Sequence, residues 1–174
     1  MKRKSFLMMP LTGYEPEIGR WLWSLEDVRR TIKERLAGLS QDLIDRRLEG
    51  RHSIGSLLYH IALIEADWLY EEVLCSGWPS EVQAMFPLEH RNSSGELAHF
   101  HGETIEAHFN RMDSIREIFL SHFRTMDMED WKKPRVLPNY DVTPEWVVYH
   151  LIEHEAHHRG QIFQLLSYLE HLKD

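Results

Sequence analysis

The chain has 174 residues, of which 43% are apolar and 28% are charged. This is ordinary globular composition, and the length fits a single domain over residues 1–174 with a buried core. The formal net charge of −8 argues against nucleic-acid binding, because proteins that grip phosphate backbones need a basic surface.

Two helices are expected in the first half of the chain. The first spans residues 16–39: Pro16 suits a first helical turn, apolar residues recur every three or four positions, and Gly38 marks the end. The second spans residues 53–75, with Ser53 as its N-cap and an apolar stripe that starts at Ile54.

Two more helices are expected in the second half. One spans residues 95–126, with Ser93 or Ser94 as its cap. The other spans residues 144–172 and starts at Thr143-Pro144-Glu145. This string combines a capping hydroxyl, a proline whose missing N–H is not needed, and an acid near the positive end of the helix dipole.

Four amphipathic helices without alternating strand patterns predict an all-α four-helix bundle. The segment between the second and third helices, residues 76–94, is long enough to cross the bundle from end to end. These two helices are therefore expected to run parallel, which gives an up-down-down-up topology with a long crossover between them.

The sequence also limits the compartment. Cys75 is the single cysteine, so an intramolecular disulfide is impossible, and a reducing compartment is the simplest interpretation. No uncharged stretch reaches the roughly 18 apolar residues of a membrane span. We therefore expect a cytoplasmic protein that has no membrane partner.

The fourth helix carries two histidines at core positions. Its inward seam advances by three or four residues at each step. The seam consists of Val147, Leu151, His154, His158, Ile162, Leu165 and Leu169. His154 and His158 lie one turn apart on the same face, where one metal ion can satisfy both buried imidazoles. Two core histidines bonded to protein neighbours are the alternative.

A third metal ligand must come from another helix, because catalytic metal sites usually take three protein ligands and keep one position open. His60 is the best candidate, since it lies one turn from Leu57 and Ile64 on the second helix. His101 and His108 on the third helix compete with it.

Two sequence motifs suggest other functions. His154-Glu155-Ala156-His157-His158 fits the H-E-x-x-H string of zincin proteases, but Gln161 and Gln164 stand where the metzincin extension has glycine and histidine. Glu155-x-x-His158 and Glu96-x-x-His99 fit the string of di-iron bundles, but no inward glutamate pair accompanies them.

Two segments of the chain resemble the DinB/YfiT family of small metalloenzymes. One is His60-Ile61-Ala62-Leu63-Ile64-Glu65-Ala66-Asp67-Trp68. The other is His154-Glu155-Ala156-His157-His158-Arg159-Gly160-Gln161-Ile162, which is similar to that family's His-x-x-x-His-Arg-Gly-Gln signature.

The resemblance implies an up-down-down-up bundle and a three-histidine site formed by His60, His154 and His158. It implies zinc, nickel or iron as the ion and a small-molecule substrate. Some relatives resemble thiol S-transferases or isomerases that use a low-molecular-weight thiol. The resemblance is also compatible with a homodimer.

The expected chemistry follows from three neutral imidazoles and one open position. Such an ion can activate water for hydrolysis or a low-molecular-weight thiol for transfer. Gln161 is expected to hydrogen-bond a ligand or substrate, and Glu155 is a candidate base by analogy with zincins. A metal-binding stress-response protein without turnover is the non-enzymatic alternative.

Overall fold

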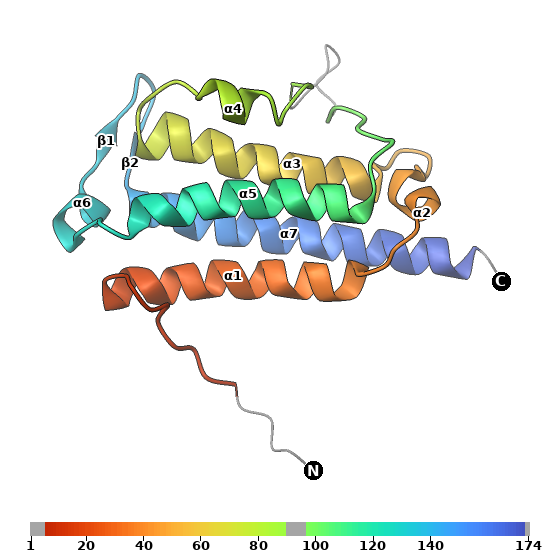
Figure 1. The fold of residues 1–174 in the computed structure, drawn as a ribbon, viewed down its shortest axis with the longest axis horizontal. Coiled ribbons are helices and arrows are strands. Elements are labelled where there is room, and N and C mark those ends of the chain that lie inside the picture. Colours follow the sequence, from red (N-terminus) through yellow and green to blue (C-terminus); the bar gives the residue numbers. More distant parts are fainter. Residues whose placement is uncertain (1–5, 90–96, 173–174) are drawn as a thin grey trace.

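The computed structural model describes residues 6–89 and 97–172, in which four long helices lie side by side (Figure 1). These are α1 (Pro16–Leu36), α3 (Ile54–Asp67), α5 (Ile105–Phe123) and α7 (Pro144–His171). A π-helix, η1 (Trp68–Val73), extends α3. The shorter helices are α2 (Gln41–Asp45), α4 (Ser80–Gln83) and α6 (Met128–Lys132). Strands β1 (Arg135–Val136) and β2 (Asp141–Val142) form a small antiparallel hairpin. The chain is thus mostly helical.

Local capping explains where three of the long helices begin. The side chains of Ser53, Thr104 and Thr143 accept hydrogen bonds from the backbone N–H groups of Ser56, Ala107 and Trp146. Each bond satisfies one of the N–H groups that a first helical turn leaves without a partner. The expected caps at Ser53 and Thr143 are therefore present.

The third long helix begins later than its apolar pattern predicts. The expected caps Ser93 and Ser94 lie outside the described residues, as do residues 95 and 96. Residues 98–104 form no helix, and α5 begins at Ile105. The N–H of Phe100 bonds Ser56 on α3, and Gly102 has a φ of 89°. This left-handed conformation, which glycine tolerates, interrupts the helix that the sequence pattern indicated.

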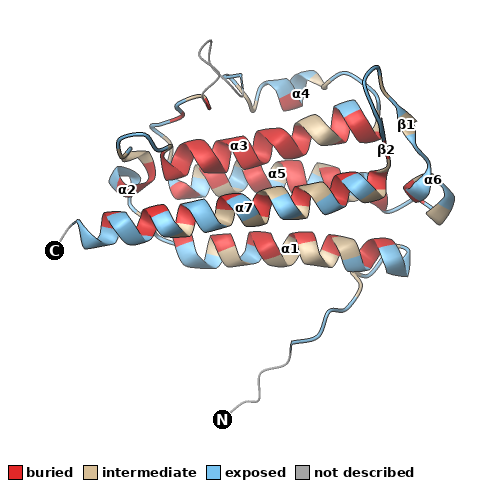
Figure 2. Cartoon of the chain, turned by 180° about the vertical axis from the view of Figure 1, so that it is seen from behind, coloured by how far each residue is buried: buried red, intermediate tan, exposed pale blue. Residues whose placement is uncertain are grey.

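The core has two clusters, one at each end of the long helices. One contains the start of α1, the end of α3 with η1, the end of α5 and the start of α7. The other contains the end of α1 and the starts of α3 and α5, together with the end of α7. Figure 2 shows that α3 is buried along almost its whole length.

The packing of the helices places the histidine-bearing segments next to each other. α3 contacts both α5 and α7, and α1 contacts the same two helices. His60 on α3 therefore faces the helix that carries His154 and His158. In the described part of the chain, none of the helices is long and apolar enough to span a membrane.

Candidate metal centre

His60, His154 and His158 form a cluster that could hold a metal ion. One ring nitrogen from each lies within 4.8 Å of the others. Nε2 of His154 is 3.1 Å from Nε2 of His60 and 3.1 Å from Nε2 of His158. Two residues one turn apart on α7 thus meet a third from α3. His101 and His108, the competing candidates, are not part of this cluster.

The donor set fits one divalent ion. Ligand nitrogens around a tetrahedral zinc lie about 3.3 Å apart, given bonds of about 2.0–2.1 Å. The 3.1 Å contacts are close to this spacing. The Nε2 proton of a neutral His154 can form a hydrogen bond to only one of the two rings, His60 or His158. A metal ion, in contrast, accepts a lone pair from all three rings. Imidazole suits zinc, nickel and iron alike.

Burial keeps the rings of His154 and His158 in the form that a metal requires. Desolvation, with the nearby charges of His158, His150 and His157, lowers the pKa of His154 to about 3, although Glu65 opposes the shift. Desolvation also lowers the pKa of His158. Both rings are therefore neutral at pH 7 and offer lone pairs to an ion.

Gln161 fixes the tautomer of His158. Nδ1 of His158 lies 2.7 Å from Oε1 of Gln161. Because an amide oxygen only accepts, Nδ1 carries the proton and Nε2 keeps the lone pair that faces the cluster. The amide nitrogen of Gln161 donates to Nε2 of His157 at 3.0 Å. The side chain of Gln161 thus supports the site from outside the three-histidine set.

A cavity of about 410 Å³ opens onto the cluster. This volume is within the usual range of small-molecule sites. Besides the three histidines and Gln161, its wall contains His52, Ile64, Trp68, Leu97, His150 and His157. The sequence analysis did not single out His52, Ile64, Trp68 or Leu97 for this role.

A comparison with known protein families finds a match over most of the chain. The sequence pattern of the DinB superfamily matches residues 24–162. The chain belongs to the DinB superfamily.

A solved structure supports the fold of this DinB-superfamily protein. A conserved protein from Enterococcus faecalis superimposes with a TM-score of 0.66 at 14% sequence identity. The match covers 84% of this chain and 92% of that one. At this identity the likeness concerns the fold alone. No curated protein matches the chain.

Beside the histidine cluster, this DinB-superfamily chain buries four charged residues, one from each long helix. They are Arg29 on α1, Glu65 on α3, Arg116 on α5 and Glu155 on α7. Both arginines contact both glutamates, at distances of 2.5–3.0 Å. We call these four residues the charge network. Because each charge is paired within it, the network meets the condition for burying ions in a core.

Glu155 therefore lies in a different setting from the one its motif suggested. Both of its carboxylate oxygens accept hydrogen bonds, one from Arg29 and the other from Arg29 and Arg116. In a zincin, the glutamate at this point of the string works beside the metal. Glu96, the other glutamate of the motif that resembles di-iron bundles, is outside the described residues.

One feature of the sequence indicates the charge network. Glu65 is the acid inside an almost continuous apolar run of α3, and Glu65 itself is 2% exposed. A carboxylate on a helix that is apolar all round has to be paired. Its partners come from other helices, however, so their identity depends on the tertiary packing.

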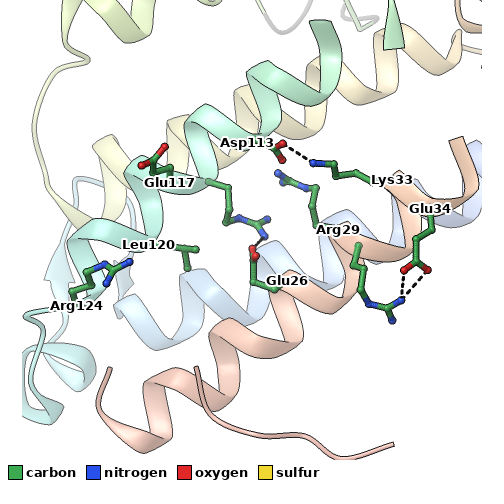
Figure 3. Close-up of a pocket in the computed structure, with 10 residues that line it drawn as sticks. Glu26, Arg29, Lys33, Glu34, Asp113, Glu117, Leu120 and Arg124 are labelled. Atoms are coloured by element: carbon green, nitrogen blue, oxygen red, sulfur yellow. Dashed lines mark hydrogen bonds and ion pairs between the residues drawn. The ribbon is translucent and has the colours of Figure 1, made fainter. Parts of the chain in front are cut away.

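The outer side of the charge network reaches a groove between α1 and α5. Figure 3 shows this cavity of about 480 Å³, in which Glu26 approaches the arginine of α5 and Lys33 bonds Asp113. Arg29 and Arg116 both line it, whereas none of its lining residues lines the histidine cavity. The groove holds opposite charges that pair with each other, and it is separate from the metal centre.

The remaining candidate histidines lie elsewhere. His101 is exposed and stacks on His99, with ring centroids 5.0 Å apart. His108 is 1% exposed and packs against Phe100. Burial, as the largest effect, lowers the pKa of His108 to about 4. It is a neutral core histidine in this fold.

Proposed function

We propose that this protein is a metal-dependent enzyme that acts on a small molecule, with one divalent ion held by His60, His154 and His158. The observation that carries the proposal is the convergence of three imidazole nitrogens at the wall of a cavity of about 410 Å³. A metal with three protein ligands keeps a position for a substrate or water, and the cavity provides access to it.

The bound ion, zinc, nickel or iron, would supply the Lewis acidity that lowers the pKa of water or of a low-molecular-weight thiol. The reaction class is accordingly hydrolysis or thiol S-transfer. The protein's own groups bind and orient. Gln161 holds the tautomer of His158 and lines the cavity, where its amide can also meet a substrate.

Glu155 has a supporting part in this proposal. Its two oxygens are bonded to buried guanidinium groups, so it joins α7 to α1 and α5. This arrangement favours a positioning role for Glu155 next to His154 over the proton transfer that the motif suggested.

The proposal includes the up-down-down-up bundle. Two observations support it: the composition of the two core clusters, and the direction of the colour gradient along α3 and α5 in Figure 1. It also includes a cytoplasmic location, which the single cysteine favours, and a substrate other than nucleic acid, which the charge of −8 favours.

Elemental analysis of the purified protein tests the proposal. We expect about one zinc, nickel or iron per chain in the wild type and little in His60→Ala, with His101→Ala as a matched histidine control that keeps its metal. Equal metal in wild type and His60→Ala would overturn the three-histidine site. Stoichiometric metal without turnover of any thiol or hydrolysable substrate would instead support the metal-binding stress-response alternative.

A further inference from the structure

A third cavity, of about 600 Å³, lies next to the metal centre. It is bounded by η1, the segment that carries the β1–β2 hairpin, and the first turn of α7. Its wall includes Trp68, Trp146, Tyr140, Pro134, Val142 and Asp141. We call this cavity the aromatic groove. Nothing in the proposed chemistry of the histidine cluster accounts for it.

Trp68 connects the aromatic groove to the histidine cavity, because it lines both. Its ring centroid lies 5.3 Å from that of Trp146 and 4.5 Å from that of His150. The ring of His150 is in turn 6.0 Å from that of His154. The two cavities therefore share the side chain of Trp68.

The aromatic groove presents apolar surface to solvent. Trp146 is 44% exposed and Tyr140 is 47% exposed. Aromatic side chains grouped in a concave site are typical of ligand pockets and expose faces that attract cations.

The wall of this groove carries a negative charge. Asp141 is the charged residue among the described residues of its wall. Behind the wall, the Tyr140 hydroxyl donates to Glu72 at 2.7 Å. The pKa of Tyr140 is raised to about 12. This hydrogen bond is the largest cause, followed by burial and by the charges of Glu72, Asp67 and Glu71.

The basic residues nearest in sequence lie outside this wall. Lys132, Lys133 and Arg135 flank Pro134, but none of them lines the groove. Lys132 pairs with Glu17, and Arg135 pairs with Asp130. Aromatic faces combined with the Asp141 carboxylate, and no cation among the described residues of the wall, match a positively charged organic ligand.

We propose that the aromatic groove binds a small aromatic amine, and that this molecule is the substrate, or part of it, of the metal centre. The ring packs against Trp68 and Trp146, and the ammonium group is attracted to Asp141. The substrate assignment rests on the proposed function, whereas the binding itself depends only on the groove.

The first test measures binding to metal-free protein by isothermal calorimetry. Three probes share one ring and differ in charge: phenethylamine, 2-phenylethanol and 3-phenylpropionate. We expect the amine to bind at least ten-fold more tightly than the acid, with the alcohol between them. Equal or reversed affinities would overturn the cation site, whatever happens at the metal centre.

Variants assign the binding to the groove. Trp146→Ala should weaken phenethylamine at least five-fold, whereas Tyr168→Ala, a similarly exposed aromatic of α7, should not change it. Asp141→Asn should remove most of the preference for the amine, whereas Asp113→Asn, the same change in the α1–α5 groove, should keep it. Equal effects within either pair would contradict the assignment.

The second test concerns the link to the metal. Cobalt(II) bound at the histidine cluster should broaden the NMR lines of phenethylamine, and diamagnetic zinc should not. Tight amine binding without this broadening would separate the groove from the metal centre and remove the substrate assignment. Failure of the cluster to bind any metal would contradict the proposed function. The preference for the amine, measured by calorimetry on metal-free protein, would remain valid.

Discussion

Gln161 holds His158 in the ring orientation that a metal ligand needs. Replacing it by alanine removes the 2.7 Å bond to Nδ1 and leaves the tautomer unfixed. Loss of such a supporting bond typically lowers metal affinity about 10–100-fold. We expect a loss of this size in Gln161→Ala, measured by competition with a chelator of known affinity. Gln164→Ala, one turn later on the same helix, should bind metal like the wild type.

His108 makes the stability depend on pH. Its folded pKa of about 4 lies below its ordinary value of 6.5 because the ring is buried. As pH falls through this window, the unfolded chain takes up the proton first, so stability is present above pH 6.5 and is lost towards pH 4. From this shift we expect the residue to account for a loss of about 3 kcal/mol over this range.

Urea unfolding of metal-free protein between pH 7 and pH 4 measures this effect. His108→Leu should lose less stability on acidification than the wild type, whereas His122→Leu, at an exposed position of the same helix, should behave like the wild type. The same acid dependence in His108→Leu and wild type would show that other groups cause it.

At the scale of the element, the charge network connects the four long helices next to the histidine cluster. Removing one partner of a buried pair leaves an uncompensated charge, and this typically costs about 3–5 kcal/mol. We expect a loss of this size in Glu155→Gln, measured by urea unfolding of the metal-free protein. Asp113→Asn, which breaks the partly exposed pair with Lys33, should cost less than about 1 kcal/mol.

The same variant separates two roles of Glu155. If Glu155 positions α7, Glu155→Gln should lower stability and metal affinity together, because α7 is then no longer held against α1 and α5. Unchanged stability with abolished turnover would instead support the general base that the motif suggested.

Elements were predictable where their signals are local. The i, i+4 spacing of His154 and His158, and the caps at Ser53 and Thr143, act within one turn, so the sequence alone identified them. The start of α5 was predicted too early, because the apolar pattern continues upstream of Ile105 and the local cap at Thr104 was not recognised. The backbone before it is held by a hydrogen bond between Phe100 and Ser56, which are 44 positions apart, and no local pattern encodes that bond. The π-helical turn that carries Trp68 likewise has no sequence signature that we recognised.

At the scale of the whole molecule, residues distant in sequence form the candidate site. His60 and His154 are 94 positions apart, and the partners of Glu155 come from α1 and α5. The apolar stripe of α3 and the family resemblance pointed to His60. The cavity wall and the aromatic groove depend on how η1, the hairpin and α7 pack, and no periodicity encodes that.

An ion shared by α3 and α7 should stabilise the fold as a whole. A ligand that binds only the folded state contributes about 2.7 kcal/mol at a free concentration of 100 times its dissociation constant. We expect zinc or nickel to raise the midpoint of thermal unfolding of the wild type, and a chelator to reverse this.

His154→Ala should not respond to the metal, because its Nε2 contacts both other rings. His122→Ala, which removes an exposed histidine, should respond fully. An equal shift in both variants would mean that the metal binds elsewhere on a histidine-rich surface. In that case the three rings would be packing partners, and the fold would not depend on an ion to join α3 to α7.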